Sequence, residues 1–310
     1  MNKNTCLPIE VINPIAKMID LKPYYYTPFG TAFLGDSLEI MKRLPSSSID
    51  LIMTSPPYAL VFKKEYGNVD ATEYVEWFLE FGKEFKRILK DTGSLVIDIG
   101  GVWNKGQPTR SLYQFELLIA LSKIFHLAQE FYWYNPAKLP SPAEWVTVQR
   151  IRVKDAVETV WWLSKTPFPK ADNRKVLQPY SEDMKRLIKN GYRQKKRPSG
   201  HNITEGFGKD NNGSIPPNLL RIGNTDSNSN YLKLCEENKI RPHPARFPQE
   251  LPDFFINFLT DINDVVLDPF CGSNVTGISA ESNKRKWIGI DTVEEYLIGS
   301  GYRFPRICKQ

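Results

Sequence analysis

A chain of 310 residues can form one large domain or two ordinary ones, and its 41% of apolar and 12% of aromatic residues are ample for a hydrophobic core. The four cysteines are far apart and form no CxxC pair, so neither a disulfide framework nor a zinc site is indicated. No apolar run approaches the length that crosses a bilayer. The composition argues against a membrane protein and a disulfide-rich secreted domain, and it favours a soluble cytoplasmic protein.

The positive charge is concentrated in one segment. Residues 165–200 contain 11 Lys and Arg against 3 Asp and Glu, a local charge of 11 − 3 = +8, so the rest of the chain carries 6 − 8 = −2. Clustered Lys and Arg supply most of the sequence-independent affinity for nucleic acids, although a solvated basic loop would have the same composition. The segment thus indicates either a surface for a polyanion or an exposed loop.

After an irregular arm of about 30 residues, the hydrophobic pattern alternates between strands and helices. The clearest helix is expected over residues 72–89, where apolar side chains are spaced by three and four, and the Asp-Thr-Gly sequence at 91–93 is expected to end it. The other elements predicted in this half are strands at 31–34, 49–53, 94–99, 127–134 and 158–163 and helices at 38–44 and 112–125.

Basic and small polar residues dominate from residue 165 to about 230, where one helix is favoured, at 181–190, with Ser181 as its cap. Regular structure is expected to resume with helices at 248–259 and 274–282 and strands at 264–267 and 286–290. This alternation predicts an α/β fold with an open parallel sheet, helices on both faces and ligands at the carboxyl ends of the strands. The predicted organisation is an arm at 1–30, two halves of one sheet domain at 31–164 and 231–310, and an insertion at 165–230.

The sequence TSPPY at 54–58 follows the strand predicted at 49–53. Neither Pro56 nor Pro57 has a backbone N–H, so the strand stops there, and the turn presents carbonyl acceptors beside the Ser55 hydroxyl and the Tyr58 ring. This combination can hold an amino group. We expect Asp36, which follows the strand predicted at 31–34, on a neighbouring strand end.

A second constellation lies in DPFCGSN, residues 268–274, between a predicted strand and a predicted helix. Gly272 allows the backbone to approach a ligand, and the start of the helix offers free N–H groups. Asp291 ends the next strand, 291 − 272 = 19 residues later, where a carboxylate can accept ribose hydroxyls. The loop lacks the G-x-G-x-x-G pattern that a nicotinamide dehydrogenase needs, so it suits a nucleoside without phosphates, such as S-adenosylmethionine. An ordinary strand-to-helix turn remains the alternative.

TSPPY and DPFCGS resemble motifs IV and I of the amino methyltransferases that act on exocyclic nitrogens of DNA bases. Their order, with a basic region between them, resembles the circularly permuted β group of that family. More closely, GDSLEIMKRLP, TSPPYAL, NTDSNSNY and HPARFPQELPDFF are similar to the PvuII-type N4-cytosine methyltransferases, over residues 31–302. Asn274 stands where many members have a second glycine, a departure that the PvuII-type branch shares.

This resemblance implies a Rossmann-like S-adenosylmethionine-dependent methyltransferase sheet, circularly permuted, with a small inserted target-recognition region. It implies that Ser55 and the Pro56 carbonyl hold the target amine, while Pro57 keeps the turn rigid and Tyr58 stacks on a flipped base. The implied cofactor-binding residues are Asp36, His243, Phe247, Asp268, Phe270, Gly272, Ser273 and Asp291. The residues expected to bind DNA are Trp133 and Asn135, in a segment resembling motif VIII, and the basic Lys195, Lys196 and Arg197.

The implied activity is transfer of a methyl group from S-adenosylmethionine to N4 of a cytosine flipped out of duplex DNA. A restriction endonuclease that acts on the same site is a further expected partner. Ser at position 55, where relatives specific for adenine have Asp or Asn, favours cytosine, and N6 of adenine remains an alternative. A protein or RNA nitrogen methyltransferase and a non-enzymatic DNA-binding protein are alternatives of other classes, although the latter has no use for an acceptor turn opposite a nucleoside site.

The cysteine of the 268–274 loop and the three histidines do not indicate further chemistry. Methylation of cytosine at C5 needs a cysteine nucleophile, but Cys271 lies in the loop assigned to the cofactor, and we expect it to pack. His126, His201 and His243 are too scattered in the sequence for a metal cluster, so no metal is expected.

Overall fold

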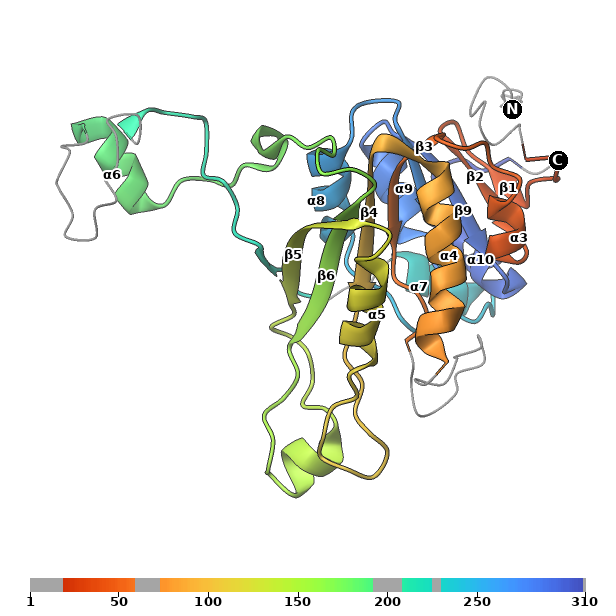
Figure 1. Cartoon of the computed structure of the whole chain (residues 1–310), viewed down its shortest axis with the longest axis horizontal. Coiled ribbons are helices and arrows are strands. Elements are labelled where there is room, and N and C mark those ends of the chain that lie inside the picture. Colours follow the sequence, from red (N-terminus) through yellow and green to blue (C-terminus); the bar gives the residue numbers. More distant parts are fainter. Residues whose placement is uncertain (1–18, 59–72, 192–207, 225–229, 309–310) are drawn as a thin grey trace. The chain divides into compact units, whose positions relative to one another are not determined.

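The structure is a computed structural model that describes residues 19–58, 73–191, 208–224 and 230–308 (Figure 1). It divides into two compact units, one comprising residues 1–171 and 218–310 and the other residues 172–217. The second unit is narrower than the insertion predicted at 165–230. Its function as a target-recognition region stays a prediction.

Among the described residues, the first unit is built on a nine-stranded sheet with the order β1-β2-β9-β8-β3-β4-β6-β5-β7. Its strands are β1 (Tyr25–Tyr26), β2 (Gly30–Leu34), β3 (Ile49–Thr54), β4 (Leu89–Ile99), β5 (His126–Tyr134), β6 (Val157–Ser164), β7 (Leu219–Arg221), β8 (Val265–Asp268) and β9 (Lys286–Asp291). The α/β class and the predicted strands are confirmed. The short strands β1 and β7 were not predicted, because two or three residues carry no periodic signal.

The sheet is mixed, so the prediction of a parallel sheet is wrong at two places. Strand β6 runs antiparallel to both β4 and β5, and β1 runs antiparallel to β2. The chain passes from β5 to β6 through residues 135–156, which contain one short π-helical turn, η1 (Glu144–Val148), and no crossover helix. A connection that stays at one edge of the sheet returns the chain in the opposite direction.

Strand β4 also begins earlier than predicted. Leu89 already pairs with Ile49, and the register changes before the next pair, Leu51 with Ser94. Residues 91–93 therefore form an irregularity inside a long strand and not the turn that was expected there.

Helices cover both faces of the sheet (Figure 1). One hydrophobic cluster joins the sheet to α3 (Ser37–Met41), α4 (Tyr74–Ile88) and α5 (Tyr113–Leu121). The other joins it to α8 (Glu250–Leu259), α9 (Val275–Ser282) and α10 (Glu294–Gly301). Successive strand residues alternate between the clusters, with Leu51 in the second and Ile52 in the first, as side chains on a pleated sheet must.

Two helices of the first unit, α10 and α7 (Asn230–Glu237), were not predicted. They pack together at Gly299, where an added Cβ would lie 3.2 Å from Cys235 Sγ. The second unit contains η2 (Asn173–Val176) and α6 (Glu182–Asn190). Ser181 caps α6 as predicted, accepting a hydrogen bond from the Met184 amide at 3.2 Å.

None of the described helices is long and apolar enough to cross a membrane. No group of three or more His, Cys, Asp or Glu in the described part of the chain could hold a metal ion. Among the described cysteines, Cys235 and Cys271 are free and buried, whereas Cys308 is disulfide-bonded, which the wide cysteine spacing did not predict.

Candidate active site

The carboxyl ends of β3, β4 and β8 border a cavity of about 430 Å³. The TSPPY turn continues β3, and the 268–274 loop continues β8, which pairs directly with β3 through Leu51 and Val266. The structure thus brings two motifs more than 200 residues apart to one edge of the sheet. The predicted site residues that line the cavity are Ser55, Pro56, Pro57, Tyr58, Trp133, Asn135, His243, Phe247, Asp268, Phe270 and Ser273.

Asp36 is not among the described residues that line this cavity. Its exposed carboxylate caps α3 and accepts a hydrogen bond from the Glu39 amide at 2.9 Å. The order β2-β9-β8-β3 places two strands between Asp36 and the TSPPY turn, so the expectation that they occupy neighbouring strand ends is wrong. The crossovers that insert β8 and β9 come from the far end of the chain, which local patterns do not reveal.

Gly272 and Asp291 support the loop from outside the lining. Asp291 accepts hydrogen bonds from the amides of Gly272 and Val293, both at 2.8 Å, and burial raises the pKa of its carboxyl. Gly272 has a φ of +48°, and an added Cβ would lie 2.9 Å from the His243 ring. Glycine is needed here for both its conformation and its small size.

Asn274, the residue that departs from the family pattern, also adopts the left-handed conformation, with a φ of +56°. Asparagine tolerates this region better than other non-glycine residues. Its side chain caps α9 by accepting from the Gly277 amide at 3.0 Å and donates to Tyr25 Oη at 3.0 Å. The substitution therefore keeps the turn and adds two hydrogen bonds.

Asp268 joins the two motifs. Its carboxylate, with 3% of the side chain exposed, accepts from Thr54 Oγ1 at 2.8 Å, from Thr276 Oγ1 at 2.7 Å and from the Phe270 amide at 3.1 Å. Burial raises the pKa of Asp268 from 3.8 to about 6, and the three hydrogen bonds oppose that rise. Because Thr54 is the last residue of β3, this carboxylate positions the start of the TSPPY turn against the loop.

In the turn, the two proline carbonyls differ in their partners. Tyr74 Oη donates to the Pro57 carbonyl at 2.8 Å, whereas none of the described residues donates to the Pro56 carbonyl. The Pro56 carbonyl and the Ser55 hydroxyl are therefore the acceptors that the turn offers to a ligand.

A charged network beside the turn was not predicted from the sequence. Tyr58 Oη donates to Glu158 Oε2 at 2.9 Å, and Lys138 Nζ donates to Glu158 Oε1 at 2.8 Å. An added Cβ at Gly100 would lie 2.7 Å from the Tyr58 ring, so the glycine makes room for that ring. Lys138 and Glu158 both line the cavity.

Asp98, near the carboxyl end of β4, is the second residue that sequence reasoning missed. It lines the cavity, is 2% exposed, and its Oδ1 has no hydrogen-bond partner among the described residues. Burial, and then the negative charge of Glu158, raise the pKa of Asp98 well above its usual value, while Lys138 and a hydrogen bond with Ser55 oppose that rise. One signal was available, because an ionisable residue within the apolar SLVIDIG strand is unusual.

The comparisons with known proteins agree with this geometry. A family model described as DNA methylase matches residues 49–299. The chain belongs to the DNA methylase family. It is 54% identical over 288 residues to the type II methyltransferase M.PvuII of Proteus hauseri, covering 91% of this chain and 86% of that protein. It is also 27% identical to the type II methyltransferase M.ScaI of Streptomyces caespitosus, covering 89% and 81%.

A solved structure described as PvuII DNA methyltransferase (cytosine-N4-specific) superposes on this DNA methylase with a TM-score of 0.76 and 47% identity, covering 93% of this chain and 90% of that one. The resemblance stated from the motifs is thereby confirmed, as is the methyltransferase fold class. The structure of M1.HpyAVI with S-adenosylmethionine has a TM-score of 0.51 at 18% identity and supports the fold alone.

In this methylase Cys271 is buried, and burial raises the pKa of its thiol well above the usual value. Its burial agrees with the packing role expected from the sequence, and a neutral thiol is a poor nucleophile. His243 packs edge-on against Tyr296 with ring centroids 4.6 Å apart, and its Nδ1 hydrogen-bonds the Ala245 carbonyl. The ring is thereby held against the loop at Gly272.

Trp133 and Asn135 both line the cavity from the end of β5. Trp133 is 4% exposed and donates from Nε1 to the Ile222 carbonyl at 2.9 Å. The Asn135 Oδ1 accepts from the amides of Ala137 and Asn224 at 3.1 and 3.2 Å. Lys195, Lys196 and Arg197, also predicted to bind DNA, lie outside the described residues.

Proposed function

We propose that the chain transfers a methyl group from S-adenosylmethionine to the exocyclic N4 of a cytosine flipped out of duplex DNA. The observation that carries the proposal is the hydrogen bond of 2.8 Å between Thr54 and Asp268, which holds an acceptor turn and a nucleoside-type loop around one cavity. Membership of the DNA methylase family supports DNA as the substrate.

The residues at the loop fit S-adenosylmethionine. The ligand carries positive charge, and Asp268 and Asp291 are buried carboxyls whose ionised forms a cation would favour. Phe247 and Phe270 line the cavity and offer apolar surface to the adenine. Asp291 accepts a hydrogen bond from the Gly272 amide of the loop and is assigned to the ribose. Ser273 and His243 are assigned to the methionine end of the cofactor. Asp36 is assigned a smaller part in cofactor binding, because its carboxylate caps α3. When bound, the cofactor supplies an electrophilic methyl group.

The acceptor turn activates the amine. The lone pair of a cytosine N4 is delocalised into the ring, and two acceptors that bind its hydrogens draw the nitrogen toward tetrahedral geometry. The Ser55 hydroxyl and the Pro56 carbonyl are placed for this, and Pro57 is fixed by the hydrogen bond from Tyr74. Because these acceptors need no reorganisation, they can favour the transition state over the ground state.

The amine must lose a proton when it gains the methyl group. Asp98 is the candidate to accept it, since it lines the cavity and has a buried oxygen without a donor among the described residues. The raised pKa of Asp98 lies closer to neutral pH than that of an ordinary carboxyl, and a general base works best when its pKa is near the working pH. No covalent intermediate is involved.

Tyr58 is proposed as the platform for the flipped base. Unstacking costs a few kcal/mol, which a pocket must recover by stacking and hydrogen bonding. The hydrogen bond from Tyr58 Oη to Glu158 and the packing against Gly100 fix the ring. Trp133 and Asn135 close the same cavity from β5.

Cytosine is preferred to adenine for two reasons. Position 55 is Ser, and the relative that is 47% identical in the structural comparison is described as cytosine-N4-specific. The type II relatives further support a companion restriction endonuclease for the same DNA site. We also assign target recognition to residues 165–230, with Lys195, Lys196 and Arg197 on the DNA.

The decisive test is incubation with tritiated S-adenosylmethionine and duplex DNA, followed by digestion to nucleosides and mass spectrometry. The expected product is N4-methylcytosine. N6-methyladenine as the sole product would overturn the assignment to cytosine, and the absence of any methylated nucleoside would favour a DNA-binding protein without activity.

A further inference from the structure

Two loops project from the carboxyl edge of the sheet (Figure 1). One comprises residues 100–112, after β4, and the other residues 135–156, between β5 and β6; together they are called the double loop. The second loop begins with Asn135 and Lys138, which line the cavity. A duplex that delivers a base into the cavity must approach this edge, so the double loop borders the path of the flanking nucleotides.

The two loops are braced against each other. Asp155 Oδ2 accepts from Trp103 Nε1 at 2.9 Å and from Arg110 Nη1 at 2.7 Å, and the Arg110 guanidinium lies 4.9 Å from the centre of the Trp103 ring. Arg152 Nε donates to the Pro108 carbonyl at 3.1 Å. A surface that is already ordered loses little conformational entropy when it binds.

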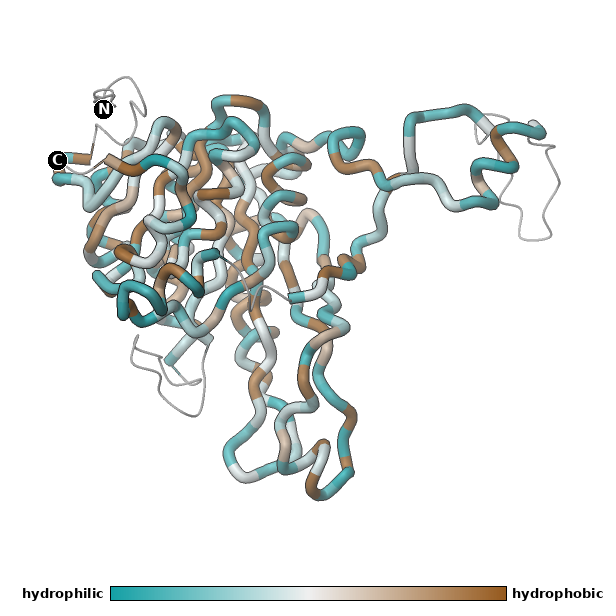
Figure 2. Tube along the Cα trace, turned by 180° about the vertical axis from the view of Figure 1, so that it is seen from behind, coloured by the Kyte–Doolittle hydropathy of each residue, from teal (hydrophilic) through white to brown (hydrophobic). Residues whose placement is uncertain are grey.

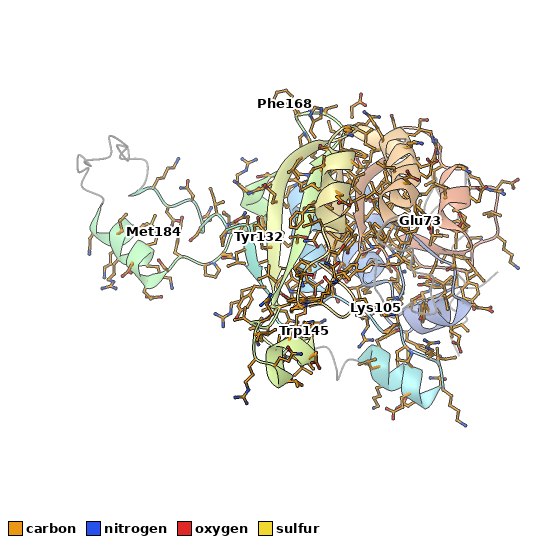
Figure 3. The ribbon with its side chains drawn as sticks, turned by 60° about the horizontal axis from the view of Figure 1, so that its bottom comes forward. Glu73, Lys105, Tyr132, Trp145, Phe168 and Met184 are labelled. Atoms are coloured by element: carbon orange, nitrogen blue, oxygen red, sulfur yellow. The ribbon has the colours of Figure 1, made fainter. Side chains whose placement is uncertain are left out.

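The exposed part of the double loop alternates cations with apolar side chains. Residues 150–154 read Arg-Ile-Arg-Val-Lys and are all exposed, with Val153 at 86%. Figure 2 shows hydrophobic and hydrophilic positions mixed along these loops. Figure 3, in which the bottom of Figure 1 comes forward, labels Lys105 on the first loop and Trp145 on the second.

These cations are not neutralised. Lys105, Arg150, Arg152 and Lys154 form no ion pair with any carboxylate in the described part of the chain. In the second unit, by contrast, Arg174 and Lys185 pair with adjacent carboxylates at 2.8 and 2.7 Å. Unpaired cations suit phosphates, and aliphatic groups between them suit sugars and base edges.

We propose that the double loop binds the duplex beside the flipped nucleotide, with Lys105 and residues 150–154 against the sugar–phosphate backbone. The inference rests on the proposed function, because DNA must be the substrate. It adds a DNA-binding element outside residues 165–230. Residues 150–154 lie close to the cavity, because Lys154 Nζ donates to the Lys138 carbonyl at 3.0 Å and Lys138 lines the cavity.

The test compares the Lys105→Ala/Arg150→Ala variant with the Lys86→Ala/Lys123→Ala variant. Lys86 and Lys123 are exposed, belong to no ion pair among the described residues, and precede β4 and β5 at the opposite edge of the sheet. The dissociation constant for a mixed-sequence duplex is measured over a series of NaCl concentrations. Replacing Lys105 and Arg150 should reduce the slope of log Kd against log salt by about 1 per cation, about 2 in all, and the control should leave it nearly unchanged.

Calorimetric titration with S-adenosylmethionine and thermal unfolding accompany the test, and both should be the same in all three proteins. If the two double variants have the same slope of log Kd against log salt while the wild type methylates DNA, the inference is overturned and the proposed function stands. If the wild type neither binds nor methylates duplex DNA, the proposed function fails first and the inference with it. A variant that unfolds at a lower temperature is replaced by Arg150→Gln, for which a slope reduced by about 1 is expected.

Discussion

Asp268 and Asp98 lie near the carboxyl ends of two strands of the same sheet, both are buried, and burial raises the pKa of both. They differ in their partners. Asp268 accepts three hydrogen bonds that tie β3 to the loop after β8, whereas Asp98 keeps one oxygen without a donor among the described residues. A buried carboxyl with its hydrogen bonds satisfied holds structure, and one left unsatisfied inside a cavity is available for chemistry.

Asp98→Asn is expected to have the largest effect. Asparagine keeps the size of the side chain but cannot accept a proton, so kcat should fall by roughly 10²–10⁴-fold while S-adenosylmethionine affinity stays the same. Steady-state methylation with tritiated cofactor measures the loss. The matched control is Asp50→Asn, because Asp50 is also buried but is the second residue of β3, at the opposite edge, where it accepts from Lys90 and Val265. That variant should lose stability and keep its kcat; equal losses of kcat would contradict the role of Asp98.

Ser55→Ala tests the acceptor turn itself. Removal of one preorganised partner of the developing charge should lower kcat by about 10²–10³-fold and change the KM for S-adenosylmethionine little. Ser122→Ala, at an exposed serine after α5 whose Oγ donates to the Ile119 carbonyl, is the control. Comparable activity of both variants would remove Ser55 from the mechanism.

The free energy of unfolding should depend on pH through the buried carboxyl of Asp268. Its pKa rises from 3.8 to about 6, so the folded state holds the proton more tightly than the unfolded chain does. The corresponding stability is complete below pH 3.8 and is lost as the pH rises through about 6, by roughly 3 kcal/mol. In urea unfolding, the wild type should lose stability relative to Asp268→Asn as the pH rises over this range, because asparagine does not titrate. A stability difference that does not change with pH would contradict the raised pKa of Asp268.

The smallest expected effect is that of Thr276→Val. This change removes the donor to Asp268 Oδ2 and leaves a buried carboxylate oxygen without a partner, at a cost of about 1–2 kcal/mol. Thr92→Val, at an exposed position of β4, should stay within about 0.5 kcal/mol of the wild type. Denaturant titration distinguishes them, and equal stabilities would show that Asp268 does not depend on this hydrogen bond.

Much of the fold followed from local patterns. The helix α4 and the strands β3, β8 and β9 were predicted to within a few residues, because their apolar spacing acts over short distances, as do the prolines that follow β3 and β8. The 268–274 loop and the TSPPY turn also stood out through short stretches of sequence. Asp36 was misplaced because its position depended on the order of strands that are distant in the chain.

The α/β class, the two motifs and the methylase family could be predicted from the sequence alone, since they depend on residues close together in the chain. Tertiary structure alone decided that β6 runs antiparallel, that Thr54 meets Asp268, and that Asp98 and Glu158 share one cavity. The physical reason is that local propensity carries no information on pairings across 100 or 214 residues, such as Tyr58 with Glu158 and Thr54 with Asp268. Such contacts form when the whole sheet assembles and buries its two faces.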